Sequence, residues 1–186
     1  IDTAKIAKEE GLRCIIVSNG FIQEEPLREL IPYIDGANID LKSFDKDFYK
    51  KITGGWIEPV LRSLKILKEE GVWTEVTNLI IPTLNDEEEN IEELSKWLKD
   101  NMGKDVPVHF TAFYPTHKMT DIAPTSKEIL ENAKKIAEKY LNYVYLGNLN
   151  GETNTKCSEC GEIVIRRSGF GMREFKLEDG KCSKGH

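Results

Sequence analysis

An acid and a lysine stand two residues apart at the end of an apolar stretch of the chain. Asp40 and Lys42 close the segment Asn38-Ile39-Asp40-Leu41-Lys42, which we expect to end a β-strand. Alternate residues of a strand point to the same face, so the two opposite charges share one face. Charges on a core strand are costly unless they are paired or used. The spacing therefore indicates either a mutual ion pair or a ligand site, and we favour the ligand site.

A second group with useful chemistry lies near the C-terminus. Cys157 and Cys160 form a C-x-x-C knuckle, Cys182 adds a third thiol after a hairpin-like stretch, and His186 is the candidate fourth ligand. Thiolate and imidazole groups at this spacing are typical of structural zinc in a zinc-ribbon-like module, which stabilises a segment too small for its own core. An additional iron–sulfur site and reduced free thiols are the alternatives.

Other polar residues give weaker signals. Cys14 stands alone in an apolar stretch, so the cysteines do not form a disulfide framework. His109 and His117 are single histidines, which are more often packed or surface residues than catalytic ones, and we assign neither to catalysis. The pair Asn19-Gly20 predicts by itself only a turn with positive φ.

Alternating helices and strands must position these residues. Apolar periodicity, caps and turn signals predict helices at 2–10, 24–31, 58–70, 87–100 and 127–140. Strands are expected at 12–17, which we predict to be buried, and at 36–42, 72–81, 106–114 and 142–146. Asn85 or Asp86 is the expected cap of the fourth helix, and Ser126 that of the fifth.

The alternation predicts an α/β fold with parallel strands covered by helices. An open doubly wound sheet and a complete or partial barrel both fit it. In either architecture the ligand meets the carboxyl ends of the strands. Polar or unusual residues collect there, at Ser18-Asn19-Gly20, Asp40-Leu41-Lys42, Thr77-Asn78 and Phe113-Tyr114-Pro115.

Composition limits the class of protein. With 186 residues, 39% hydrophobic and 31% charged, the chain suits one globular domain, expected at residues 1–150, and a small module at 151–186. The net charge is -6 and charges of both signs interleave, which predicts no nucleic-acid or membrane partner. No apolar run approaches the roughly 18 residues of a membrane span. We expect a cytoplasmic protein.

The ordered set of segments resembles a known family. Residues 17–21 (VSNGF), 39–42 (IDLK), 76–85 and 109–115 come in the order seen in radical S-adenosylmethionine (SAM) enzymes. The chain is similar to the activating enzymes of glycyl radical enzymes, such as pyruvate formate-lyase activating enzyme. Residues 143–148 (YVYLGN), followed by C-x-x-C, look like the branch called AmmeMemoRadiSam system radical SAM enzyme.

This resemblance implies a partial (β/α)6 barrel in which a 4Fe–4S cluster reduces SAM to methionine and a 5′-deoxyadenosyl radical. The radical abstracts hydrogen, here expected from a protein or peptide substrate, and a flavodoxin or ferredoxin is the expected reducing partner. The C-x-x-x-C-x-x-C loop that holds such a cluster and a Gly-Gly-Glu-Pro-like segment are not in the sequence. We therefore expect an N-terminally truncated chain that lacks the first strands and is inactive alone.

The resemblance also implies which residues contact SAM. Asp40 and Lys42 match the D-x-K of the activating enzymes, where the acid takes the amino or ribose groups and the lysine takes the carboxylate. Some relatives carry an arginine near the position of Thr77, and relatives often have a histidine near that of Tyr114. The cofactor-binding set implied is Ser18, Asn19, Gly20, Asp40, Lys42, Thr77, Leu79 and Tyr114.

Two other classes of function remain open at this point. In the first, Lys42 is the nucleophile of a Schiff-base barrel lyase. Asp40 argues against this class because a neighbouring carboxylate keeps the amine protonated. In the second, the protein is a non-catalytic zinc-ribbon interaction protein whose barrel has decayed. A C-x-x-x-C-x-x-C motif upstream in the parent gene would exclude both classes.

Overall fold

A parallel five-stranded sheet forms the centre of the protein. The computed structural model describes residues 1–149, 151–169 and 171–186. The strands lie side by side in sequence order, and the α/β class expected from the alternation is confirmed. They are β1 (Ile15–Ser18), β2 (Gly36–Asp40), β3 (Trp73–Ile80), β4 (Val108–Ala112) and β5 (Val144–Gly147).

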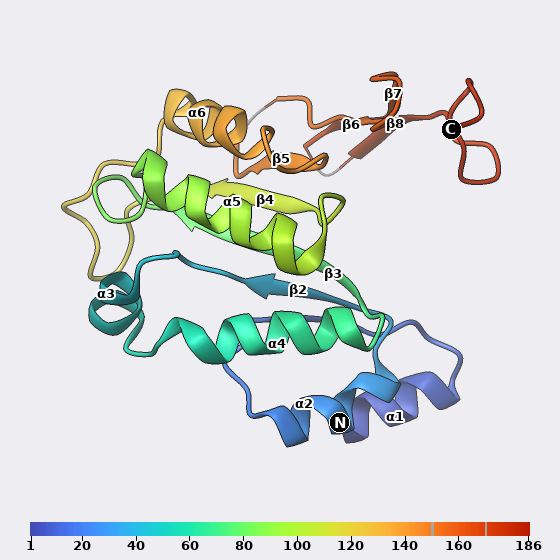
Figure 1. Cartoon of the computed structure of the whole chain (residues 1–186), viewed down its shortest axis with the longest axis horizontal. Helices are drawn as coiled ribbons and strands as arrows, with labels where there is room; N and C mark the ends of the chain where they lie inside the picture. Colours follow the sequence, from blue (N-terminus) through green and yellow to red (C-terminus); the bar gives the residue numbers. More distant parts are fainter. Residues whose placement is uncertain (150, 170) are drawn as a thin grey trace.

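Helices cover one face of this sheet. Figure 1 shows α4, α5 and α6 in a row in front of the strands, with α1 and α2 at the lower end. The helices are α1 (Asp2–Glu9), α2 (Glu24–Leu30), α4 (Ile57–Glu69), α5 (Glu88–Met102) and α6 (Lys127–Ala137). Short turns η1 (Ile31–Tyr33), α3 (Lys46–Phe48) and the π-helical η2 (Tyr49–Thr53) complete the connections.

The core lies between the helices and the sheet. Leu64, Leu94 and Leu130 project from α4, α5 and α6 and are fully buried. The strand register sets Ile39, Val76, Val108 and Val144 in one row across β2 to β5, and all four are buried. Burial of each large apolar side chain contributes roughly 1.5–3 kcal/mol, so this layer fixes the register of the strands.

Two local expectations differ from the structure. The strand expected at 12–17 is observed at Ile15–Ser18. It was expected to be buried, but Ile15 and Val17 are 70% and 79% exposed. They are exposed because β1 is the outer strand of the sheet and both side chains lie on the face without helices. Helix α5 begins at Glu88 after Glu87, which makes no side-chain cap, so Asn85 and Asp86 are not its caps. The Ser126 cap is confirmed, because its Oγ accepts from the N–H of Ile129.

The C-terminal segment forms a separate antiparallel sheet, which lies beyond β5 at the upper right of Figure 1. Its strands are β6 (Thr155–Lys156), β7 (Ile163–Ser168) and β8 (Gly171–Phe175). The expected domain boundary at residue 150 falls outside the described residues and stays a prediction. Within the described ranges, no helix combines the length and the apolar character needed to cross a bilayer.

Candidate functional site at the carboxyl edge of the sheet

The face of the sheet that carries no helices presents polar side chains. Along β3 the side chains alternate, so that Thr74, Val76, Asn78 and Ile80 are buried under the helices while Thr77 and Leu79 lie on the opposite face. We call this second face the open face. Register pairs Thr77 with Asp40 on β2 and with His109 on β4, so these residues share the open face.

Asp40 and Lys42 lie at the carboxyl end of β2 and pair with each other. Their Oδ2 and Nζ atoms are 2.9 Å apart, and the side chains are 25% and 33% exposed. The mutual ion pair considered from the sequence is therefore present. Both groups remain accessible to solvent on the open face, so the ligand role of the pair stays a prediction.

The turn after β1 has the backbone expected from its sequence. Gly20 has a φ of +67°, and its N–H donates to Ser18 Oγ, while the N–H of Phe21 donates to Asn19 Oδ1. Gly20 is buried, and a Cβ at this position would lie 2.8 Å from Cγ2 of Ile39. Its observed contacts are with the helix-covered side of the sheet, and its expected proximity to SAM stays a prediction.

The remaining expected contacts lie on β3 and after β4. Thr77 Oγ1 donates to Asn38 Oδ1 at 2.8 Å, which joins β3 to β2 on the open face. Leu79 is half-buried two residues further along the same face. The hydroxyl of Tyr114, a 56% exposed residue, donates to the carbonyl of Asn148 at 2.8 Å. Contact between these side chains and a cofactor stays a prediction.

The sequence reasoning missed Asn38, which the structure adds to the open face. Asn38 precedes Asp40 by two residues, so Asn38, Asp40 and Lys42 form an alternating polar row at the end of an apolar strand. Polar residues at every second position, 38, 40 and 42, are the sequence signal that places Asn38 on the same face as Asp40 and Lys42. An amide beside two opposite charges adds a donor and an acceptor for a zwitterionic ligand.

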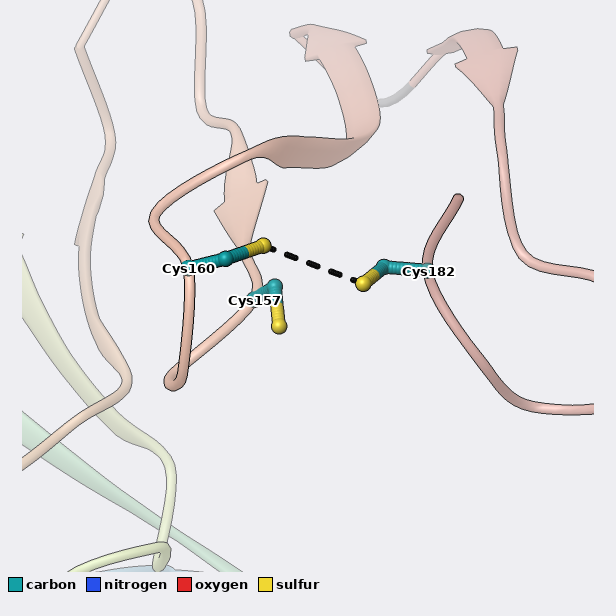
Figure 2. Close-up of side chains that lie close together, drawn as sticks. All are labelled: Cys157, Cys160 and Cys182. Carbon is teal, nitrogen blue, oxygen red and sulfur yellow. Dashed lines mark hydrogen bonds between the residues drawn. The ribbon is translucent and has the colours of Figure 1, made fainter. Parts of the chain in front are cut away.

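Three cysteine sulfurs meet in the C-terminal module, as Figure 2 shows. The Sγ atoms of Cys157, Cys160 and Cys182 all lie within 4.8 Å of one another, and those of Cys160 and Cys182 are 3.8 Å apart. Tetrahedral zinc with Zn–S bonds of about 2.3 Å separates its thiolates by about 3.8 Å, so the three cysteines fit a zinc ion. The ring of His186 is not part of this group.

Hydrogen bonds at Cys182 favour its thiolate form. Burial alone would raise the pKa of Cys182, but the backbone N–H groups of Lys184 and His186 and the neighbouring thiols lower it below its ordinary value. A lowered thiol pKa helps a cysteine to ligate a metal. His186 also accepts, through its backbone carbonyl, from the N–H of Cys182. Its role as a fourth ligand stays a prediction.

A cavity of about 790 Å³ separates the module from the amino-terminal half of the open face. On its sheet side, Glu75 accepts from Trp73 Nε1 at 3.1 Å and lies 2.6 Å from His109 Nε2. The His109 ring stacks on Tyr145, whose hydroxyl contacts Thr155 of the module at 3.0 Å. These bonds give His109 a packed role, as expected from the sequence, and they connect the module to the sheet.

Five parallel strands, helices on one face and polar side chains at the carboxyl edge of the other define a partial α/β barrel. The family model of the Radical SAM superfamily matches residues 1–98, more than half of the chain. The chain belongs to the radical SAM superfamily, which confirms the family expected from the sequence.

Two similar proteins match most of this chain. The chain is 41% identical over 180 residues to an uncharacterized protein of Methanocaldococcus jannaschii, covering 95% of this chain and 53% of that protein. It is 31% identical over 151 residues to the pyruvate formate-lyase-activating enzyme of Clostridium pasteurianum, covering 76% of this chain and 61% of that enzyme. The chain thus spans about half to three-fifths of the length of these relatives.

A solved structure shows the same fold. A domain of the pyruvate-formate lyase-activating enzyme from Bacteroides vulgatus superposes with a TM-score of 0.69 at 19% identity, covering 79% of this chain and 88% of that chain. At this identity the likeness shows the fold alone. The expected α/β fold of radical SAM type is confirmed.

Proposed function

We propose that this chain is part of a radical SAM enzyme that resembles pyruvate formate-lyase activating enzyme and acts on a protein or peptide. The observation that carries the proposal is the row Asn38, Asp40 and Lys42 on the open face of a radical SAM fold. The methionine end of SAM carries an ammonium and a carboxylate group. Asp40 offers a partner for the ammonium, and Lys42 offers one for the carboxylate.

The residues of the chain fit SAM but not the iron–sulfur cluster. Asp40 and Lys42 would hold the amino and carboxylate groups of the methionine part, and Thr77 and Leu79 would line the rest of the site. When bound, a 4Fe–4S cluster supplies the electron that cleaves SAM to a 5′-deoxyadenosyl radical. The sequence has four cysteines, three of them in the zinc-like group and the fourth, Cys14, before β1, so no cysteine of this chain stands at the carboxyl edge. The proposed cluster therefore needs ligands other than the cysteines of residues 1–186.

Cys157, Cys160 and Cys182 are proposed to hold a structural zinc ion, with His186 as the fourth ligand. The spacing of the three sulfurs supports this assignment. Such an ion would stabilise the small β6–β8 sheet, which buries few large apolar residues of its own. A flavodoxin or ferredoxin as electron donor and a cytoplasmic location complete the proposal.

The function is tested on the full-length product of the gene, prepared anaerobically with iron and sulfide and then reduced. We expect 5′-deoxyadenosine release from SAM, and Lys42→Met should weaken SAM binding roughly 10- to 100-fold, because one charge-assisted hydrogen bond is lost. Lys51→Met, which removes an exposed lysine paired with Asp47, is the matched control. Absence of both cluster and 5′-deoxyadenosine in the native protein would refute the proposal.

A Schiff-base lyase is the alternative function, and it can be tested on the same protein preparation. Lys42 Nζ lies 2.9 Å from Asp40 Oδ2, so an ion pair already engages the amine that a Schiff base would use. Borohydride trapping of a carbonyl compound on Lys42 would support the lyase and count against the radical SAM role of this residue.

A further inference from the structure

The backbone around Lys42 is held by side chains from other elements. Strand β2 ends at Asp40, yet the N–H of Leu41 still donates to the carbonyl of Thr77 at 3.0 Å. The N–H of Lys42 then donates to the Tyr49 hydroxyl at 3.1 Å. Because these bonds keep the chain extended past the strand, Lys42 stays on the same face as Asp40.

Two buried asparagines hold the carbonyls of the same segment. Asn78 Nδ2 donates to the carbonyl of Leu41 at 2.7 Å, and Asn85 Nδ2 donates to that of Lys42, also at 2.7 Å. Asn78 is fully buried and Asn85 is 2% exposed. Lys42 therefore has both its backbone donor and its backbone acceptor bonded to side chains that lie under the open face.

Asn85 is itself fixed by further bonds. Its Oδ1 accepts from the N–H of Ile81 at 2.7 Å, and its own carbonyl accepts from Asn90 Nδ2 at 2.8 Å. Asn90 Oδ1 in turn accepts from the N–H of Phe44 at 2.7 Å and from Ser43 Oγ at 3.1 Å. The segment from 41 to 44 is thus joined to β3 and α5 through amides that are removed from solvent.

Burying polar side chains lowers the stability of the fold wherever one of their hydrogen-bonding atoms has no partner. Burying an amide without a partner costs roughly 1–3 kcal/mol, and Asn78 Oδ1 is a buried acceptor without a donor among the described residues. An apolar residue would pack at position 78 without that cost. The Nδ2 bond to Leu41 is the evident compensation, which indicates that the geometry of this segment matters.

We infer that Tyr49, Asn78 and Asn85 are positioning residues that fix the direction of Lys42, and with it the Asp40–Lys42 pair, for the methionine end of SAM. The inference rests on the proposed function. All three side chains are buried, and each bonds to the backbone of the segment, so we assign them an effect through Lys42 and not a contact with the ligand. Burial, and to a smaller degree the charge of Asp40, raises the pKa of Tyr49 to about 12, so its hydroxyl stays neutral at working pH.

Tyr49→Phe is the mildest test, because it removes one oxygen and keeps the ring. Tyr140→Phe is the matched control: it also removes one hydroxyl, which bonds from the turn after α6 to Glu92 of α5, away from the segment. Both variants of the full-length protein are measured for SAM affinity and for amide hydrogen exchange of the peptide that contains residues 41–48.

We expect Tyr49→Phe to weaken SAM binding about 3- to 10-fold and to speed exchange at Lys42, whereas Tyr140→Phe should change neither. Equal behaviour of the two variants would overturn the inference. If the native protein binds no SAM while exchange at Lys42 still rises in Tyr49→Phe, the proposed function fails and the structural part of the inference stands. Asn85→Asp, which keeps the Oδ1 acceptor but replaces the Nδ2 donor, should reproduce the effect of Tyr49→Phe more strongly.

Discussion

Glu75 keeps a negative charge in a half-buried position because two donors hold its carboxylate. The hydrogen bond from His109 lowers the pKa of Glu75 below its ordinary value of 4.5, burial opposes this shift, and the bond from Trp73 adds to it. A carboxyl whose pKa is lower in the folded than in the unfolded protein stabilises the fold above its ordinary pKa. That contribution is lost as the pH falls through the folded pKa.

Replacing Glu75 by Gln should therefore have a pH-dependent cost. We expect Glu75→Gln to be less stable than the native protein at pH 7, and the difference in unfolding free energy to shrink as the pH falls below 4.5. Urea unfolding at pH 7 and at acidic pH measures this difference. The exposed Glu9→Gln is the control. A difference that stays constant over this range would contradict the assignment.

The hydrogen bonds of Asn85 could not be predicted from the residues next to it in the sequence. From the sequence it reads as a helix cap, because it precedes an apolar periodic run. In the structure its amide bonds to Lys42, 43 residues away, and to Leu79. Ser126 was predicted correctly because its partner, Ile129, lies three residues further on. Local caps follow from sequence, whereas long-range side-chain bonds depend on the packed sheet.

At the scale of elements, the turn from β1 into α2 depends on one glycine. Gly20 combines a positive φ with close contact to Ile39 and Val60, and its carbonyl accepts from Ser63 Oγ at 2.7 Å. A side chain at this position meets both backbone strain and steric overlap.

Gly20→Ala should cost more stability than an alanine at another glycine with similar φ. Gly11 provides the control, because its φ is +74° and no atom lies within 4 Å of the added Cβ. We expect Gly11→Ala to cost about 1 kcal/mol and Gly20→Ala about 2–4 kcal/mol, the excess coming from overpacking. Denaturant unfolding of both variants measures the costs, and equal values would show that the contact with Ile39 relaxes freely.

The helix and strand order was predictable because it rests on periodic burial. The apolar positions of α4, such as Val60, Leu64 and Leu67, repeat at helical spacing and are all buried. The turns α3 and η2 were not predicted, since they contain no such period, yet η2 supplies Tyr49 beside the candidate site. The open face was only partly predictable, because alternation shows which residues share a face but not which face the helices cover.

At the scale of the whole molecule, the C-terminal module is joined to the barrel by few polar bonds. Among the described residues, the Tyr145 hydroxyl contacts Thr155 Oγ1 at 3.0 Å and Thr153 Oγ1 donates to the carbonyl of Leu146 at 3.4 Å, and a cavity lies beside them. Strands β6 to β8 contain one buried apolar residue, Val164. The proposed zinc ion is therefore expected to supply much of the order of this module.

Loss of a metal ligand should loosen the module without unfolding the barrel. Cys160→Ser or Cys182→Ser is expected to reduce bound zinc well below one ion per chain and to speed amide exchange in β7, while β3 keeps its protection. Cys14→Ser, a cysteine whose thiol bonds only to the carbonyl of Ala4 among the described residues, is the control. Metal analysis and hydrogen exchange measure both effects, and full zinc content in the variants would contradict the ligand set.

Strand β1 has a consequence for how the protein meets other molecules. In the described sheet its outer edge has no strand partner, and Ile15 and Val17 are largely exposed beside that edge. An apolar strand with free backbone donors and acceptors is a template for a further strand. When residues 1–186 are prepared alone, contact between two copies through this edge would grow with concentration, so dilute samples are the appropriate state in which to compare variants of this chain.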